Sequence, residues 1–148
     1  MIRVASRTDL AALTGLVIEF LRDTAYTNHI LTPDIEHIKR LLYALVQVGT
    51  VWIYEVDGKA CGLLAAVREP NLWQPNKISM RELVWYVKPE HRGTVSAGKL
   101  FFKYTQACEA MMKEGLIDGY FTARMPTTAD VDLEARGFRL VEKLYLRD

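Results

Sequence analysis

The chain has 148 residues, of which 50% are hydrophobic and 25% are charged, and its formal net charge is +1. This length fits one domain over residues 1–148, and the composition is that of an ordinary globular protein. The near-neutral charge argues against a nucleic-acid-binding protein, which usually carries a basic stripe. The 2 cysteines and 3 histidines are scattered, so we expect no metal site.

No apolar run approaches the roughly 20 residues that a membrane-spanning helix needs. The N-terminal residues do not read as a signal peptide, because charged and polar residues recur from Arg3 onward. We therefore expect a soluble, cytoplasmic protein without a membrane partner.

The first third of the chain predicts a strand followed by two helices. Residues 2–5 are mostly apolar, and Ser6 can cap a helix whose apolar positions recur at helical spacing to about residue 25. Thr32 is predicted to cap the second helix, with Pro33 at its first position.

The middle of the chain predicts three consecutive strands. Asp57-Gly58 is a typical hairpin turn between the first two of them. A long loop over residues 69–77 precedes the third. The predicted strands are residues 51–56, 60–67 and 78–87. This order favours an antiparallel meander.

The last third alternates helices and strands. The predicted elements are a helix over residues 95–114, a strand over 117–123, a short helix over 128–136 and a last strand over 138–146. Strand–helix–strand units favour parallel pairing through a crossover. We therefore expect an α/β fold with a mixed, mostly antiparallel sheet flanked by helices.

Residues 84–100, VWYVKPEHRGTVSAGKL, carry the strongest functional signal. A strand ends there, a loop of small residues follows, and a helix begins. Unpaired backbone N–H groups at such a helix start bind phosphate. The loop lacks G-K-[ST] and G-x-G-x-x-G, which argues against a nucleoside triphosphatase and a dinucleotide site.

This segment resembles the GCN5-related N-acetyltransferase (GNAT) family, whose strand ends V-x-P-E before [QR]-x-x-G-x-[GA] and a long helix. Residues 87–90 match the first pattern, Arg92 fills the [QR] position, and Ala97 fills the [GA] position. Gly137-Phe138 looks like the family's ending. The element order is also that of the family, so the resemblance covers the whole chain and implies the acyl-CoA N-acyltransferase (GNAT-like) fold.

The resemblance implies acetyl-CoA as donor and a small-molecule or peptide amine as acceptor, which attacks directly in a ternary complex without an acyl-enzyme. The backbone of the strand end would bind the pantetheine arm, with an N–H near Val87 as oxyanion donor, and the loop would bind the pyrophosphate, helped by the charges of Arg92 and Lys99. Dimers are common in the family, so a homodimer stays open. The predicted coenzyme-binding residues are Trp85, Val87, Arg92, Gly93, Thr94, Val95, Ser96, Ala97, Gly98 and Lys99.

Three positions depart from the family pattern. Val95 stands where the first motif glycine is usual, Leu133 where many members have a tyrosine that protonates the leaving thiolate, and Pro126 where many have an asparagine. Tyr120 and Tyr145 are candidate replacements for that tyrosine. These departures motivate an alternative, a catalytically degenerate domain that binds CoA or a protein partner.

Glu82 is the candidate general base, since it lies on the strand that leads to the loop and a carboxylate can take the proton of an ammonium acceptor. The alternative is a solvent-facing glutamate paired with Arg81 or another base. Cys108 lies on the apolar stripe of the third predicted helix, so we interpret it as a core residue rather than an acyl-carrying nucleophile.

Three aromatic or histidine residues outside this segment keep alternative interpretations. Trp73 of the long loop is expected to cover the acceptor, join a dimer interface or fold back on the core. Tyr26 and His29 fall between the first two helices, in a region that lines the acceptor pocket in the resembled family, although ordinary surface loop residues are favoured there.

Overall fold

The structure is a computed structural model that describes residues 1–24, 32–93, 95–124, 131–145 and 147. Predictions at Tyr26, His29, Thr94 and Pro126 therefore lie outside the described residues.

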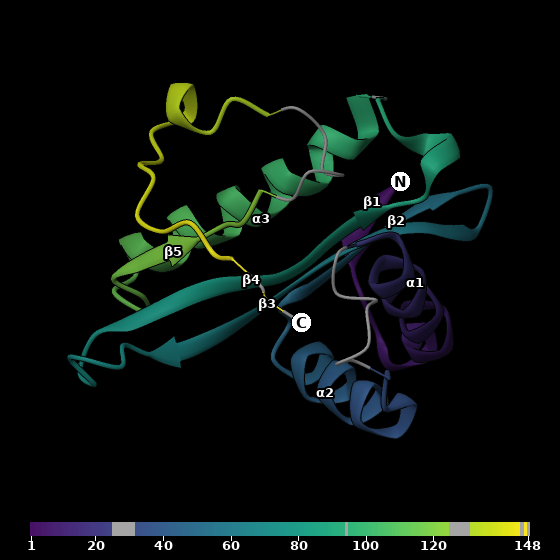
Figure 1. The fold of residues 1–148 in the computed structure, drawn as a ribbon, viewed down its shortest axis with the longest axis horizontal. Helices are drawn as coiled ribbons and strands as arrows, with labels where there is room; N and C mark the ends of the chain where they lie inside the picture. The colour runs from purple at the N-terminus through teal and green to yellow at the C-terminus, as the bar shows by residue number, and fades with distance from the viewer. Residues whose placement is uncertain (25–31, 94, 125–130, 146, 148) are drawn as a thin grey trace.

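A five-stranded sheet with the order β1-β2-β3-β4-β5 runs through the described part of the chain (Figure 1). β1 to β4 pair antiparallel in sequence order, whereas β4 and β5 pair in parallel. The strands are β1 (Ile2–Val4), β2 (Val51–Val56), β3 (Lys59–Pro70), β4 (Ile78–Val87) and β5 (Gly119–Phe121). The predicted meander, the parallel crossover and the mixed, mostly antiparallel α/β class are confirmed.

Helices cover both faces of this sheet. α1 (Leu10–Asp23) and α2 (Ile35–Gln47) lie on one face, and α3 (Val95–Lys113) lies on the other (Figure 1). Alternate strand residues feed two separate cores. Ile53, Leu63 and Tyr86 pack with α1 and α2, whereas Trp85 and Val87 pack with α3. None of the described helices combines the length and apolar character that crossing a membrane requires.

The hairpin turn between β2 and β3 is as predicted. Asp57 has φ +49° and Gly58 has φ +74°, the left-handed pair that a two-residue turn between antiparallel strands requires. The predicted start of α2 is wrong by two residues. Asp34 is the N-cap, because its carboxylate accepts the N–H of His37 at 3.0 Å, and Thr32 and Pro33 precede it.

The predicted secondary structure is least accurate after α3. Residues 138–145 form no strand. After Phe138 their apolar residues come in two adjacent pairs, Leu140-Val141 and Leu144-Tyr145, rather than in alternation, so they define no single sheet face, and Leu144 and Tyr145 are exposed. The predicted helix over 128–136 is reduced, within the described residues, to one 3-10 turn, η4 (Glu134–Arg136).

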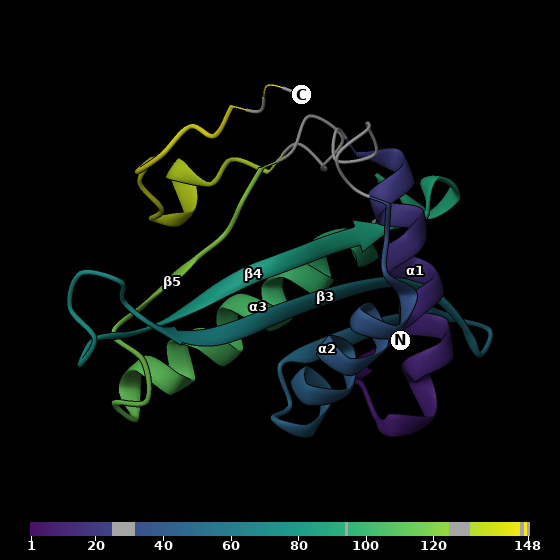
Figure 2. The same cartoon turned by 60° about the horizontal axis from the view of Figure 1, so that its bottom comes forward.

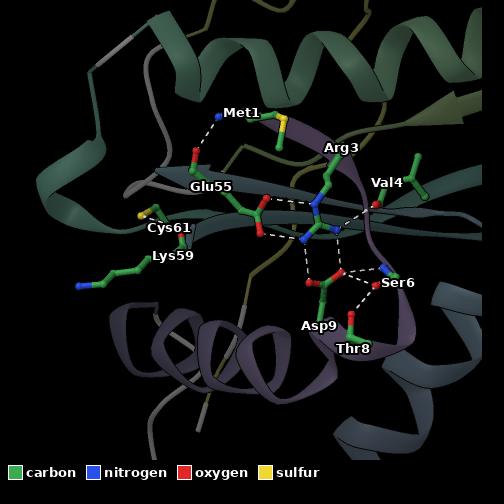
Figure 3. A network of polar contacts seen from close by, with 9 residues as sticks. All are labelled: Met1, Arg3, Val4, Ser6, Thr8, Asp9, Glu55, Lys59 and Cys61. Atoms are coloured by element: carbon green, nitrogen blue, oxygen red, sulfur yellow. Dashed lines mark hydrogen bonds and ion pairs between the residues drawn. The ribbon is translucent and has the colours of Figure 1, made fainter. Parts of the chain in front are cut away.

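An ion-pair network fixes the N-terminal strand (Figure 3). The Arg3 guanidinium donates to Asp9 at 2.8 Å and to Glu55 of β2 at 2.7 Å. The Asp9 carboxylate also accepts the N–H of Ser6 at 2.7 Å. Ser6, predicted to cap the first helix, is the N-cap of the 3-10 turn η1 (Arg7–Asp9), and Asp9 is the N-cap of α1 itself. The network joins β1, the start of the first helical segment and β2, and so orients α1 on the sheet.

Candidate functional site

β4 and β5 separate halfway along β4 (Figure 2). Among the described residues, β5 pairs only with Ser79, Met80 and Arg81, whereas β4 continues beside β3 to Val87. The second half of β4 therefore has an edge that no described strand covers. This gap between two parallel strands lies directly before the loop that leads to α3.

Backbone groups of two predicted site residues point into this gap. The N–H of Lys88 donates to the carbonyl of Cys61 at 2.9 Å, so Gly62 and Val87 form a non-hydrogen-bonded antiparallel pair. The N–H and C=O of Val87 therefore point away from β3. Because this pattern repeats every two residues, the same holds for Trp85 opposite Leu64.

The side chains of β4 hold the start of α3 against this strand end. The ring of Trp85 stacks on that of Phe101 with 4.9 Å between centroids, and Leu100 is fully buried in the same core. Gly93 has φ +74°, a conformation that favours glycine, where the chain turns toward the helix. The second turn of α3 is thereby packed against β4 near its end, and the first turn directly precedes it in the chain.

The structure leaves fewer backbone amides available to phosphate than the sequence predicted. The N–H of Arg92 already donates to the carbonyl of Pro89 at 3.2 Å, and the amide of Lys99 falls inside a helix that begins at Val95. The helix-start amides that lack intrahelical acceptors are, within the described residues, those of residues 95–97. The Val95 side chain beside them is 78% exposed, so the departure from glycine adds an apolar side chain at the mouth of the cradle.

The side chain of Arg92 lies at the strand end. Its Nε donates to the carbonyl of Val87 at 2.7 Å, and its Nη2 donates to Asp23 of α1 at 2.6 Å. The predicted contact between this guanidinium and phosphate stays a prediction, and sequence reasoning missed the partner on α1.

Glu82 lies where β4 and β5 diverge. The β3–β4 register shifts there, so that Ala65 pairs with Val84 and Ala66 with Glu82, and Leu83 is an extra residue on β4. The Glu82 carboxylate accepts hydrogen bonds from the hydroxyl of Thr122 and, at 3.1 Å, from the N–H of Ala123. The carboxylate thus takes the place of a strand partner just beyond β5, which explains why β5 is shorter than the predicted 117–123.

Burial raises the pKa of Glu82, and the hydrogen bonds from Thr122 and Ala123 oppose part of that rise. A carboxylate with a raised pKa is a stronger base than an exposed one. The alternative in which Glu82 pairs with Arg81 is wrong, because Arg81 pairs with Glu69. Glu82 was predicted as the base from its place on the strand, and that role stays a prediction, whereas Thr122 carried no signal beyond a hydroxyl in an apolar segment.

An open groove of about 2550 Å³ runs between β5, the loop after β3 and the C-terminal residues. Glu82, Thr122 and Trp73 line it, together with the two tyrosines considered as thiolate acids, Tyr120 and Tyr145, whereas none of the described residues predicted to bind the coenzyme does so. The predicted base therefore faces a different space from the predicted phosphate cradle. Trp73 is 87% exposed, so the interpretation in which it folds back on the core is wrong.

Two of the tyrosines near the groove form hydrogen bonds with the protein, and the nearby cysteine is buried in the core. The Tyr104 hydroxyl donates to the carbonyl of Phe121 at 2.7 Å, and that of Tyr120 donates to Glu109 at 2.8 Å. Tyr145 is exposed, and Leu133 packs against the α3 core. Cys108 is fully buried, and burial raises the pKa of its thiol to about 12, so the core interpretation is confirmed.

No protein-family model and no curated protein sequence matches this chain. Solved structures do match it. A predicted acetyltransferase from Clostridium acetobutylicum, solved with acetyl-CoA, superposes with TM-score 0.69 at 16% identity over 100% of this chain and 95% of that one. The ribosomal-protein-alanine N-acetyltransferase of Brucella melitensis biovar Abortus 2308 superposes with TM-score 0.64 at 16% identity over 100% and 99%.

An aminoglycoside acetyltransferase from an uncultured soil metagenomic sample, in complex with sisomicin, is similar to the same degree. Its TM-score is 0.64 at 17% identity, over 100% of this chain and 96% of that one. At these identities the likenesses show a shared fold, and that fold includes the strand, loop and helix on which the sequence resemblance rests.

Proposed function

We propose that this chain, which has the fold of the GCN5-related N-acetyltransferases, is an enzyme that transfers an acetyl group from acetyl-CoA to an amine. We further propose that residues 1–148 act as one acetyltransferase domain. The proposed acceptor is a small-molecule or peptide amine. The proposal applies both to a monomer and to a homodimer.

One observation carries the proposal: the N–H and C=O of Trp85 and the N–H of Val87 face the gap between β4 and β5, beside the segment that leads to α3, while the Val87 carbonyl accepts from Arg92. A pantetheine arm carries two amides and would bind this edge as an added strand does. Its pyrophosphate would then lie at the first-turn amides of α3, where the helix dipole favours negative charge.

In this arrangement the thioester carbonyl lies at the strand end, and the N–H of Val87 stabilises the oxyanion that forms there. The neutral amine attacks the carbonyl carbon and forms the C–N bond, the C–S bond breaks, and the leaving thiolate takes up the proton that the attacking nitrogen loses. Glu82 precedes Val87 by five residues, which is about 16 Å along a strand. At that separation direct transfer is excluded, so in this proposal a chain of waters carries the proton of the acceptor ammonium to Glu82 in its groove.

The first test is binding. Acetyl-CoA that binds only the folded state raises the melting temperature, by an amount that grows with the logarithm of its concentration. We expect a rise with acetyl-CoA that 3′-phosphoadenosine 5′-diphosphate, which keeps the pyrophosphate but lacks the pantetheine arm, reproduces only in part. No rise at millimolar acetyl-CoA would contradict the proposal.

The second test is turnover, measured as free thiol released with a panel of amines. The panel includes an aminoglycoside and a peptide with an N-terminal alanine, because two proteins of the same fold are named as acetyltransferases of these acceptor classes. We expect amine-dependent release that Glu82→Gln lowers strongly. Binding of acetyl-CoA without thiol release for any amine would favour the alternative, a degenerate domain that binds CoA without catalysis.

A further inference from the structure

Four charged side chains connect α1 with the exit of β4, and the ribbons of these two segments lie next to each other in Figure 2. Glu19 and Asp23 lie one turn apart on α1, and Lys88 and Arg92 follow β4. Arg92 contacts Asp23 at 2.6 Å, and Lys88 contacts Glu19 at 3.3 Å. These two ion pairs differ in what else they touch.

Arg92 makes three contacts at once. Its Nε donates to the carbonyl of Val87, its Nη2 donates to Asp23, and its guanidinium carbon lies 5.3 Å from the ring centroid of Tyr86. The Tyr86 hydroxyl donates to Glu19 and Asp23 at 3.4 Å each. A planar guanidinium can make such divergent contacts, whereas a lysine ammonium presents a single point charge.

Hydrogen bonds hold both polar groups of the peptide that joins Val87 to Lys88 at the end of β4. The N–H of Lys88 donates to the carbonyl of Cys61 at 2.9 Å. The carbonyl of Val87, in the same peptide, accepts from Arg92 at 2.7 Å. This peptide cannot rotate without breaking one of the two hydrogen bonds. The Val87 N–H belongs to the preceding peptide, so Arg92 restrains it through the Val87 Cα that the two peptides share.

We propose that Arg92, held by Asp23, is a positioning residue that aims the Val87 N–H at the thioester oxyanion. This inference rests on the proposed function. It differs from the role predicted from sequence, in which the Arg92 side chain binds the pyrophosphate. It also gives α1 a part in the site, since Asp23 is the last residue of that helix.

The two roles separate when the donor lacks phosphate. S-acetylpantetheine carries the thioester and both amides of acetyl-CoA but no pyrophosphate. We therefore compare kcat and KM with both donors for the wild type, Arg92→Gln, Arg92→Lys and Asp23→Asn. Lys88→Gln is the matched control, because it removes the neighbouring cation but no contact to the Val87 carbonyl.

A positioning role predicts that kcat falls by about tenfold to a hundredfold in Arg92→Gln with both donors, as small misplacements of reacting groups do. Asp23→Asn reproduces much of that loss, Arg92→Lys does not restore the rate, and KM for acetyl-CoA changes little. The proposal is overturned if Arg92→Gln impairs acetyl-CoA alone by raising its KM, or if Asp23→Asn behaves like Lys88→Gln.

A double-mutant cycle on thermal unfolding tests the same contact without any turnover. Arg92→Gln and Asp23→Asn, alone and combined, are expected to be non-additive because the residues share one ion pair. Additive effects would overturn the positioning contact itself. If the two substitutions are non-additive but the wild type transfers acetyl from neither acetyl-CoA nor S-acetylpantetheine, the contact holds and the proposed function is refuted. The failure of the contact and the failure of the function are therefore distinguishable.

Discussion

Gly62 faces Val87 across β3 and β4, and a Cβ on Gly62 would lie 2.8 Å from the carbonyl oxygen of Tyr86 and 3.1 Å from Cγ2 of Val87. The nearer of these atoms belongs to the backbone of the strand whose end carries the candidate oxyanion donor, so it cannot move without moving that strand. The pair therefore links strand packing directly to the geometry of the site.

Gly62→Ala is expected to destabilise the protein by about 1–3 kcal/mol, as other overpacking substitutions do, and to weaken acetyl-CoA binding by displacing Val87. Gly15→Ala is the control, because nothing among the described residues lies within 4 Å of its new Cβ and alanine favours the helix. The measurement is the urea midpoint together with acetyl-CoA titration. Equal stability of the two variants would contradict this reading of the β3–β4 contact.

Gly98→Ala is expected to change stability and binding in opposite directions. Gly98 lies in α3, and a Cβ there would meet no described atom within 4 Å, so alanine should stabilise the helix by up to about 1 kcal/mol. A diphosphate bound at the helix start would meet the new methyl group, which should lower acetyl-CoA affinity. A higher melting temperature with unchanged affinity would place the coenzyme away from Gly98.

The pH dependence of transfer should report the Glu82 carboxylate. Because burial raises the pKa of Glu82, kcat should increase as the pH rises through that value, since the ionised form is the base. In Glu82→Gln this limb should disappear and kcat should fall by about 10²- to 10⁴-fold. Glu114→Gln, at an exposed position after α3, is the matched control and should keep the wild-type profile.

The raised pKa of Glu82 also makes the free energy of unfolding depend on pH, in the opposite direction to kcat. The folded protein binds the Glu82 proton more tightly than the unfolded chain does, so this group favours folding below its unfolded pKa. That contribution is lost as the pH rises from the unfolded to the folded pKa. Urea unfolding of wild type and Glu82→Gln across this interval tests it, and parallel stability curves would argue against a buried carboxylate.

The sequence predicted those features that depend on local chemistry. The apolar, β-rich runs of β2 and β3, the Asp57-Gly58 turn and the helical period of α3 are properties of neighbouring residues, so they could be read along the chain. The N-cap at Asp34 was missed because Thr32, Pro33 and Asp34 offer competing helix starts. Only the contact with the N–H of His37 decides between them.

The contacts that complete the site are non-local, and the sequence does not encode them in any short pattern. Arg92 and Asp23 are 69 positions apart, and Glu82 and Thr122 are 40 apart. The position of Glu82 could be predicted from the strand, but its environment depends on where β5 leaves β4. The role of Arg92 was likewise predicted from the family motif, whereas its partners follow from the packing of α1 on the sheet.

The Arg3 network should contribute to stability in a pH-dependent way. Arg3→Gln leaves the carboxylates of Asp9 and Glu55, whose side chains are 12% and 15% exposed, without their cation. We expect a loss of about 1–3 kcal/mol, moderated by solvent screening of the partly exposed guanidinium. Lys39→Gln, which removes a more exposed ion pair with Glu36, should cost under about 0.5 kcal/mol.

The difference between wild type and Arg3→Gln should shrink in acid. The hydrogen bonds from Arg3 hold the pKa of Asp9 far below its usual range, so this stabilisation is present above the unfolded carboxyl pKa and is lost as the pH falls toward the folded value. Urea unfolding at neutral and acidic pH measures the difference. A difference that does not depend on pH would show that Arg3 acts through packing alone.

Cys108 should take no covalent part in acetyl transfer. Its side chain is fully buried, and burial raises the pKa of the thiol to about 12, so almost no thiolate is available at neutral pH. A thiol reagent should therefore react with neither cysteine until the protein unfolds, since Cys61 is buried as well. Cys108→Ala should lose stability through the cavity it creates but keep its kcat.

Rapid acid quench after mixing with labelled acetyl-CoA should leave no label on the protein, because the amine attacks the thioester directly. Label that is retained by the wild type and absent from Cys108→Ala would instead establish an acyl-enzyme.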